Sequence, residues 1–288
     1  MIPAAEAITE TVRAADGATT EVRMYRQAAD PSAPVVICMP AMATPAASYV
    51  PLAESLFQAG FQVVLGELRG QGTSSVRLRR GVRYGYHEIV TLDYPALFEA
   101  VTAAFPEAPR YLLGHSLGGQ LGALYLGQQP HRAAGAILIG APSCHYRGWP
   151  FPRNLGIFAA AHLAVGIGSV VGYFPGRRLG ILGNDSTRLM RDFAAQIRSG
   201  RYRVPSSPLD FESDLSRITQ PILVVTIEGD TMATAHGVRA LSEKLTHAAI
   251  TRVDLGFGDA THRNPHYAWI RDNTGLIDRV RTFIASGA

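Results

Sequence analysis

The chain has few of the residues that would mark it as a disulfide-rich or metal-binding protein. Only two of its 288 residues are cysteines, Cys38 and Cys144, and they lie on different predicted elements. This scarcity argues against a disulfide framework and against a cysteine-based metal or redox motif, and it fits a reducing cytoplasm. A chain of this length buries a sizeable core without such staples. We therefore expect no metal and no organic cofactor.

The chain also lacks a strong charge of either sign. Its 27 basic and 23 acidic residues give a formal net charge of +4, and arginine supplies nearly all of the positive charge. The densest basic segment, residues 77–83, is typical of a solvated loop rather than of a nucleic-acid patch, because no nucleic-acid motif accompanies it. We expect a small-molecule acyl substrate and no nucleic-acid partner, and we leave a homodimer open.

No secretory signal is evident, since the first residues lack a basic segment followed by an apolar one. We therefore expect a cytoplasmic protein. One stretch, Leu155 to Phe174, runs for 20 residues without a formal charge, which is long enough to span a membrane. However, it lies in mid-chain and contains four glycines and His162. We interpret it as part of a buried or substrate-facing helical lid, with no stable membrane span.

Alternating strand and helix patterns predict the fold class. Continuous apolar runs typical of buried parallel strands occur at 34–39, 61–66, 110–113, 134–139 and 221–227. Helical patterns occur at 48–59 and 93–105, after residue 116, and at the C-terminus. Short right-handed crossovers then imply an α/β protein, with a mostly parallel sheet and helices on both faces.

A long interruption of this rhythm predicts the domain organisation. Residues 144–220 contain no convincing central strand, although Leu189 to Ile197 form a helical stripe that Gly200 should end. Ligands bind at the carboxyl ends of strands in open α/β sheets, so an insertion there is expected to be a lid. We predict a core formed by residues 1–143 and 221–288, with a helical lid insertion at 144–220.

The strongest motif is Gly114-His115-Ser116-Leu117-Gly118, which lies between a predicted strand and a predicted helix. In this context a G-x-S-x-G sequence predicts a nucleophile elbow, a sharp turn that exposes a serine hydroxyl at the edge of a parallel sheet. The two outer glycines are expected because the strand and the helix leave no room for a Cβ. Ser116 is therefore the predicted catalytic nucleophile.

A serine needs a base to accept its proton and an acid to orient that base. In this fold the acid and the histidine should follow the serine in that order. Asp230 comes just after a buried strand and is the predicted acid, with Glu228 as the alternative and a helix cap as the alternative role for Asp230. His266, directly before the last helix, is the predicted base, and His262 is the alternative.

An oxyanion hole needs two N–H groups that point at the developing negative charge. The residue after the nucleophile, Leu117, is the first predicted donor. The second should come from the loop after the strand at 34–39. Pro40 has no N–H, so Ala41 is the predicted second donor and Met42 is the alternative.

Taken together, these motifs resemble those of α/β-hydrolases, and the resemblance covers nearly all of the chain. The segments that carry it are Gly114 to Gly119, Glu67 to Ser74, Glu228-Gly229-Asp230, and His266 ahead of the last helix. The strings Met39-Pro40-Ala41-Met42 and His266 to Arg271 are similar to those of a group of bacterial lidded serine hydrolases. The resemblance implies a catalytic triad formed by Ser116, Asp230 and His266.

The chain differs from the usual pattern of this superfamily at two places. Glu67 stands where an aspartate is usual, and we expect this glutamate to be structural. Met39-Pro40 replaces the usual His-Gly of the oxyanion loop. Gly70-Gln71-Gly72 is not a phosphate-binding loop, because the rest of that pattern is missing.

We predict a serine hydrolase that cleaves a carboxylic ester or a related acyl bond of a hydrophobic small molecule. The predicted substrate-binding residues are Met42, His115, Trp149, Phe158 and His162. Simple packing is the alternative role for His115, Trp149, Phe158 and His162. The alternative activities are an acyltransferase or another biosynthetic enzyme that uses the same triad, and a non-catalytic ligand-binding protein of the same fold.

Overall fold

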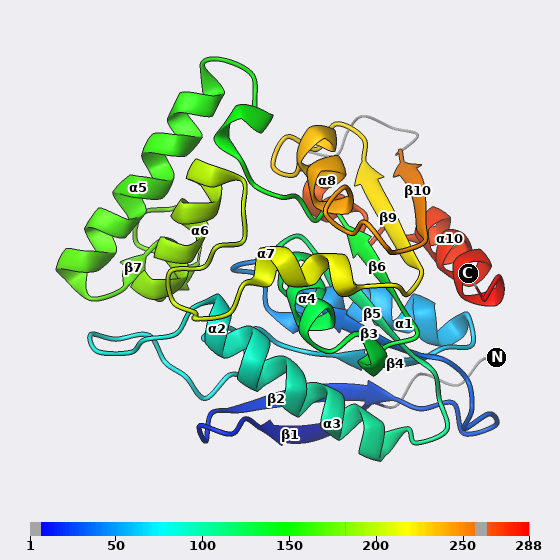
Figure 1. Cartoon of the computed structure of the whole chain (residues 1–288). Coiled ribbons are helices and arrows are strands. Elements are labelled where there is room, and N and C mark those ends of the chain that lie inside the picture. The colour runs from blue at the N-terminus through cyan, green and yellow to red at the C-terminus, as the bar shows by residue number, and fades with distance from the viewer. Residues whose placement is uncertain (1–6, 182, 257–263, 288) are drawn as a thin grey trace.

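The computed structural model describes residues 7–181, 183–256 and 264–287. Its main element is an eight-stranded sheet in the order β1-β2-β4-β3-β5-β6-β9-β10 (Figure 1). The strands are β1 Ala7–Arg13, β2 Thr19–Tyr25, β3 Val35–Met39, β4 Gln62–Leu65, β5 Arg110–His115, β6 Gly135–Ile139, β9 Ile222–Ile227 and β10 Ile250–Leu255. Strand β2 pairs antiparallel with β1 and with β4, and every other pair is parallel. The predicted mostly parallel sheet is thus confirmed.

Helices cover both faces of the sheet, which explains why the central strands are continuous apolar runs. The helices are α1 Val50–Gln58, α2 Tyr86–Glu88, α3 Tyr94–Ala104, α4 Leu117–Gln128, α5 Arg153–Val171, α6 Thr187–Ser199, α7 Phe211–Asp214, α8 Ala235–Ser242, α9 Pro265–Ala268 and α10 Thr274–Ala285. Helices α3, α4 and α8 share one hydrophobic core with one face of the sheet. Helices α1 and α10 share a second core with the other face. The elbow helix α4 is therefore held firmly between sheet and helices.

We call the chain between β6 and β9 the insertion. Its helices α5 and α6 lie at one side of the sheet, whereas α7 packs on α4 (Figure 1). The insertion contains α5, α6, α7 and a short hairpin formed by β7 (Phe174–Pro175) and β8 (Asn184–Asp185). Helix α5 packs against α6. Helix α6 ends at Gly200, whose left-handed φ of 66° provides the predicted stop. The exact lid boundaries at 144 and 220 stay a prediction.

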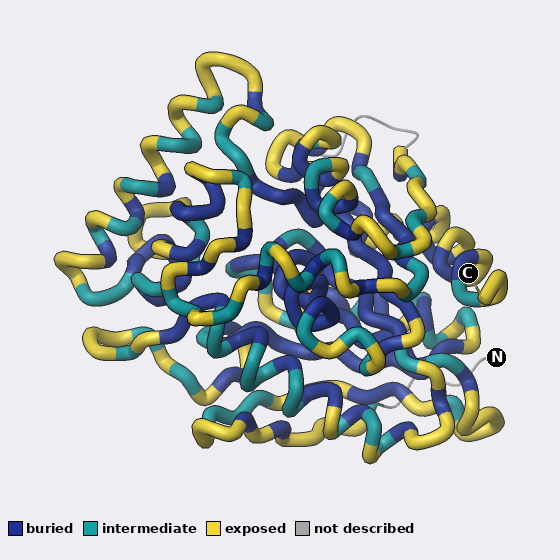
Figure 2. The backbone as a smooth tube through the Cα atoms, viewed as in Figure 1, coloured by how far each residue is buried: buried dark blue, intermediate teal, exposed yellow. Residues whose placement is uncertain are grey.

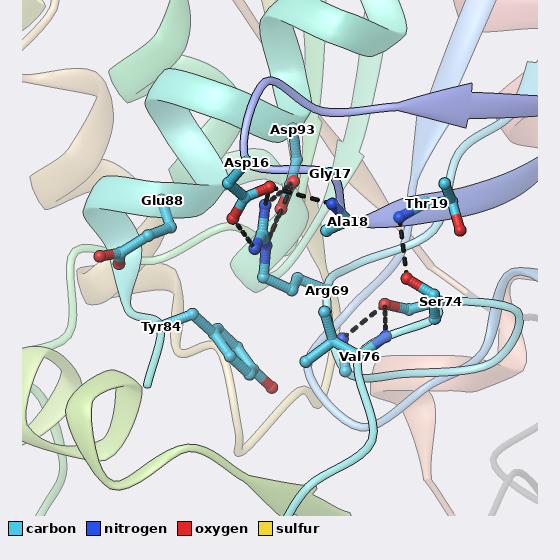
Figure 3. A network of polar contacts seen from close by, with 12 residues as sticks. Asp16, Gly17, Ala18, Thr19, Arg69, Ser74, Val76, Tyr84, Glu88 and Asp93 are labelled. Carbon is cyan, nitrogen blue, oxygen red and sulfur yellow. Dashed lines mark hydrogen bonds and ion pairs between the residues drawn. The ribbon is translucent and has the colours of Figure 1, made fainter. Parts of the chain in front are cut away.

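The loop after β4 joins three parts of the core. The Arg69 guanidinium forms ion pairs with Asp16 at 2.5 Å and Asp93 at 2.6 Å, so it ties the β1–β2 turn to the segment that leads into α3 (Figure 3). Hydrogen bonds from Arg69 lower the pKa of Asp16, whereas burial raises the pKa of Asp93. The Glu67 carboxylate accepts hydrogen bonds from the Ala46 and Leu68 N–H groups, which fits the expected structural role.

The insertion meets the core around β8. Ser186 Oγ accepts a hydrogen bond from the Tyr84 N–H at 3.2 Å, and the neighbouring Asp185 is buried. Neither Asp185 carboxylate oxygen has a hydrogen-bond partner among the described residues. Burial raises the pKa of Asp185 to about 7. This junction therefore holds a carboxyl group that burial favours in its neutral form.

Candidate active site

The serine of the elbow adopts a backbone conformation that is rare for any residue other than glycine. Ser116 lies between β5 and α4 with φ 50° and ψ −117°. The Ser116 N–H donates to Ile139 O at 3.0 Å, and the Ser116 carbonyl accepts from Gln120 N at 3.0 Å. These two bonds hold the strained turn in place, as strained functional residues require.

The glycines of the elbow are required by space, as the sequence predicts. A Cβ on Gly114 would lie 2.3 Å from the Gly119 Cα, and a Cβ on Gly118 would lie 2.5 Å from the Pro40 carbonyl oxygen. Both clashes are with backbone atoms, which cannot rotate away. The strand, the oxyanion loop and α4 therefore approach one another as closely as backbones can.

The predicted acid and the predicted base form a buried pair. His266 lies in the short helix α9, and its Nδ1 is 2.6 Å from Asp230 Oδ2. A carboxylate only accepts hydrogen bonds, so Nδ1 carries the proton and Nε2 is left as the basic nitrogen. The backbone is fixed as well, because Trp269 Nε1 donates to the His266 carbonyl at 2.9 Å.

The second carboxylate oxygen of Asp230 is occupied by the backbone. Oδ1 accepts from the N–H groups of Met232 at 2.8 Å and Ala233 at 2.9 Å. The alternative role as a helix N-cap is wrong, because the next helix, α8, begins at Ala235 with Thr234 as its N-cap. The two bonds close a turn instead. Glu228, the alternative acid, is exposed. His262, the alternative base, lies outside the described residues.

Ser116 and His266 line one cavity of about 240 Å³ beneath the insertion. Its walls come from the oxyanion loop, the start of α4, the chain after β6, α5, α6 and the segment after β9. The other lining residues are Met42, Leu117, Gln120, Pro142, Cys144, Trp149, Arg153, Ile157, Phe193, Ile197, Thr231, Met232 and Tyr267. Most of them are apolar, so the cavity suits an apolar group with one polar end near Ser116.

The structure corrects the predicted second oxyanion donor. The Ala41 N–H donates to the Tyr49 hydroxyl at 3.0 Å in a buried position, so it is already used. Met42, the alternative, lines the cavity together with Ser116. Leu117 is the first residue of α4, and the N–H groups of a first helical turn have no partner within the helix. Leu117 and Met42 both line the cavity with Ser116, and their role as oxyanion donors stays a prediction.

His115 does not contact the cavity, contrary to the prediction that it binds substrate. It is fully buried, and its Nδ1 lies 2.6 Å from the Tyr49 hydroxyl. Its ring lies 4.5 Å from the His266 ring and 4.9 Å from the Trp269 ring, measured between centroids. Burial, followed by the neighbouring His266, lowers the pKa of His115. A neutral imidazole therefore packs behind the predicted base.

These hydrogen bonds form a buried chain from the Ala41 N–H through Tyr49 to His115, whose ring packs against that of His266. The Tyr49 hydroxyl accepts from the Ala41 N–H and has its own proton to donate to His115 Nδ1. His115 then carries its proton on Nε2. A histidine at the variable position of the elbow hints at this arrangement, but nothing in the sequence pairs it with Tyr49.

Of the other predicted substrate contacts, Met42 and Trp149 line the cavity, whereas Phe158 and His162 do not. The Phe158 ring packs on Tyr146 and on His162, with centroids 5.3 and 4.2 Å away. The His162 Nδ1 lies 2.8 Å from the Phe158 carbonyl. Phe158 also packs against the cluster that contains Trp149 and Ile197, so its contacts are with the side chains of the insertion.

A second, larger hollow of about 950 Å³ adjoins the cavity. The two share Met42, Met232 and Tyr267. The second hollow is also bordered by Ser48, Thr44 and Arg271, so it is more polar than the cavity. Ser116 therefore has an apolar space on one side and a wider, more polar space beyond Tyr267.

Comparison with known proteins agrees with this architecture. Residues 34–156 match the family model described as alpha/beta hydrolase fold. The chain is 33% identical over 125 residues to lysophospholipase L2 of Escherichia coli strain K12, a match that covers 42% of this chain and 36% of the relative. The match thus spans about a third of the length of that curated relative.

Solved structures are similar over nearly the whole chain. The structure of DcsB with its substrate analogue covers 98% of this chain and 100% of its own, with a TM-score of 0.70 and 14% identity. A putative lipase from Acinetobacter baumannii covers 98% of this chain and 92% of its own, with a TM-score of 0.64 and 16% identity. The esterase EaEST from Exiguobacterium antarcticum covers 96% of this chain and 100% of its own, with a TM-score of 0.64 and 15% identity.

Proposed function

The chain is an α/β-hydrolase in fold, and on this premise we propose that it is a serine hydrolase that cleaves a carboxylic ester with a hydrophobic acyl group. The observation that carries the proposal is the buried Asp230–His266 pair at 2.6 Å, beside the same cavity as the strained Ser116. A nucleophile, a base and an orienting acid are the three parts that acyl transfer needs.

The proposed reaction has two halves. Ser116 Oγ attacks the acyl carbon while His266 Nε2 accepts the hydroxyl proton, and Asp230 stabilises the imidazolium that forms. His266 returns this proton to the leaving alcohol, and an acyl-serine ester remains. Water then attacks that ester with His266 again as the base, which releases the carboxylic acid and restores Ser116.

The negative oxygen of each tetrahedral intermediate would be bound by the N–H groups of Leu117 and Met42. Loss of one such donor typically costs about 3–4 kcal/mol of transition-state stabilisation. The proposed substrate is an ester whose acyl group fits the apolar cavity. At about 240 Å³ this cavity lies below the usual size of sites for drug-sized ligands, which supports a short or medium acyl chain.

Acyl transfer to an acceptor other than water is the second candidate. The observation that favours it is the hollow of about 950 Å³ beyond Tyr267, which has room for an acceptor or for a large leaving group. The printed name of the curated relative, a lysophospholipase, adds lysophospholipids to the substrates worth testing. Product analysis with added alcohols separates hydrolysis, which we expect to dominate, from transfer.

A panel of p-nitrophenyl esters of graded acyl length tests the proposal. We expect turnover that peaks at a short or medium chain, and we expect Ser116→Ala to lower kcat by about 10⁴-fold or more without a change in Tm. His262→Ala and His266→Ala, measured side by side, identify the base, and only the second should be inactive. Full activity of Ser116→Ala would refute the proposal.

A further inference from the structure

The two faces of α5 differ in what covers them. On the inner face Ala161, Ala164 and Gly168 are buried. A Cβ on Gly168 would lie 2.8 Å from Thr187 Oγ1 of α6, and the Thr187 hydroxyl donates to the Gly168 carbonyl. The small residues of α5 therefore let the two helices pack closely.

Exposed residues recur along α5 (Figure 2), and several of them are large apolar side chains. Leu155, Leu163 and Val170 are 54%, 64% and 76% exposed. The helix has no charged residue after Arg153. An exposed helix of a globular protein normally presents charged or polar side chains to water, so this face departs from the usual pattern.

Exposed apolar residues also occur in the sequence beyond both ends of the helix. Of the nine large hydrophobic residues of the described chain that are strongly exposed, seven lie between residues 151 and 181. We call these seven the α5 patch. They are Phe151, Leu155, Leu163, Val170, Val171, Leu179 and Ile181. Such clustering marks an interaction surface, whereas singly scattered apolar residues do not.

Basic residues predominate in the part of the sequence that carries the α5 patch. The sequence from residue 108 to residue 184 contains six arginines and no acidic residue. Arg153 begins α5, and Arg177 and Arg178 follow shortly after its end; all three are exposed. Arg80, from the basic loop 77–83, donates to the Val170 carbonyl at 2.8 Å. An apolar patch is thus bordered by cations at both ends.

Three occupants fit an exposed apolar helix, and the observations favour one of them. By length and composition α5 could cross a membrane, but its inner face is packed on α6, so lipid cannot surround it. A second copy related by two-fold symmetry would set arginines against arginines. An anionic lipid surface offers both apolar contact and negative charge.

We propose that the α5 patch docks on an anionic membrane surface, with the α5 axis in the plane of the interface. Apolar side chains enter the boundary between head groups and acyl chains, and the arginines contact lipid phosphates. Ile157 and Arg153 of the same helix line the cavity with Ser116, so docking brings the cavity close to the lipid.

Vesicle co-sedimentation tests this proposal apart from catalysis. The protein is the full chain with Ser116→Ala, so that no lipid is hydrolysed, and the probes are vesicles of phosphatidylcholine with or without phosphatidylglycerol. We expect binding to the anionic vesicles that weakens at high salt. Replacement of Arg177 and Arg178 by alanine should weaken binding about 30-fold at low salt, since each cation near the surface is worth about one tenfold step or slightly less.

The double variant Leu163→Gln/Val170→Gln tests the apolar contact. It should weaken vesicle binding at least about tenfold. Ile8→Gln is the matched control, because Ile8 is also exposed, at 53%, but lies on β1. It should leave binding unchanged. Equal binding by all variants, or no binding to anionic vesicles, would overturn the proposal. So would a dimer that dissociates in the Leu163/Val170 variant and never binds vesicles.

Discussion

At the carboxyl edge of the sheet, polar side chains are buried and paired, whereas the outer face of α5 is apolar and exposed. Asp230 uses both of its oxygens, one on His266 and one on backbone N–H groups. On α5, Leu163 is 64% exposed and contributes nothing to the cavity. The comparison teaches that burial fixes the geometry of a reacting group, while an exposed surface is free to meet a partner.

The largest expected effect comes from breaking the buried pair. Asp230→Asn removes the acceptor that fixes the His266 tautomer, so we expect kcat to fall by about 10³–10⁴-fold while the protein stays folded. Steady-state kinetics with a soluble ester measure this loss. Glu228→Gln is the control, because Glu228 is exposed two residues away. A comparable loss in both variants would mean that Asp230 is not the acid.

The junction between insertion and core gives the next effect. Asp185 has an unfolded pKa near 3.8 and a folded pKa of about 7, so the folded state holds its proton longer. The contribution of Asp185 to stability is thus greatest below pH 3.8 and falls as the pH rises to about 7, because the unfolded state ionises first.

Asp185→Asn removes this penalty, and we expect it to raise the free energy of unfolding at pH 8 by on the order of 2–4 kcal/mol. At pH 4 the variant and the parent chain should be nearly equal. Urea unfolding at both pH values measures the difference. Asp278→Asn on the exposed side of α10 is the control, and a similar gain there would contradict the assignment.

The hydrogen-bond chain behind His266 should have a smaller effect. Tyr49→Phe leaves the Ala41 N–H and His115 Nδ1 without their common partner, and a buried unpaired group costs about 1–3 kcal/mol. We expect kcat to fall about tenfold with KM unchanged, because none of these groups lines the cavity. Tyr111→Phe, at the other end of β5, is the control. An unchanged kcat would mean that these hydrogen bonds serve only the structure.

The smallest expected effect on catalysis comes from substitutions on the exposed face of α5. Leu163→Gln and Val170→Gln lie away from the cavity, so we expect kcat and KM for a soluble short-chain ester to change by less than about twofold. The same variants are expected to lose vesicle binding. Loss of soluble activity would show that the outer face of α5 serves the chemistry after all.

Much of the fold could be predicted because its signals are local. A buried parallel strand such as β3 is a continuous apolar run, and a left-handed glycine such as Gly200 ends a helix. The elbow, Asp230 and His266 each have a fixed place relative to a strand or helix. Strand β1 was not predicted, because its residues are mostly exposed and carry no clear alternation.

The rest of the site depends on contacts between distant residues. The Tyr49 hydroxyl accepts a hydrogen bond from the Ala41 N–H, and only the folded chain brings these two groups together. Which face of α5 meets the cavity depends on how it packs on α6, so Ile157 lines the cavity whereas Phe158 does not. An apolar run predicts burial by default, which is why the exposure of Leu163 could not be foreseen.

Covalent labelling with a fluorophosphonate tests the central claim most directly, because the probe reacts only with a serine activated by its own base. The account predicts one adduct, on the peptide that carries Ser116, and greatly slowed labelling of His266→Ala. Labelling that persists undiminished in Ser116→Ala, or an adduct on a different residue, would contradict it.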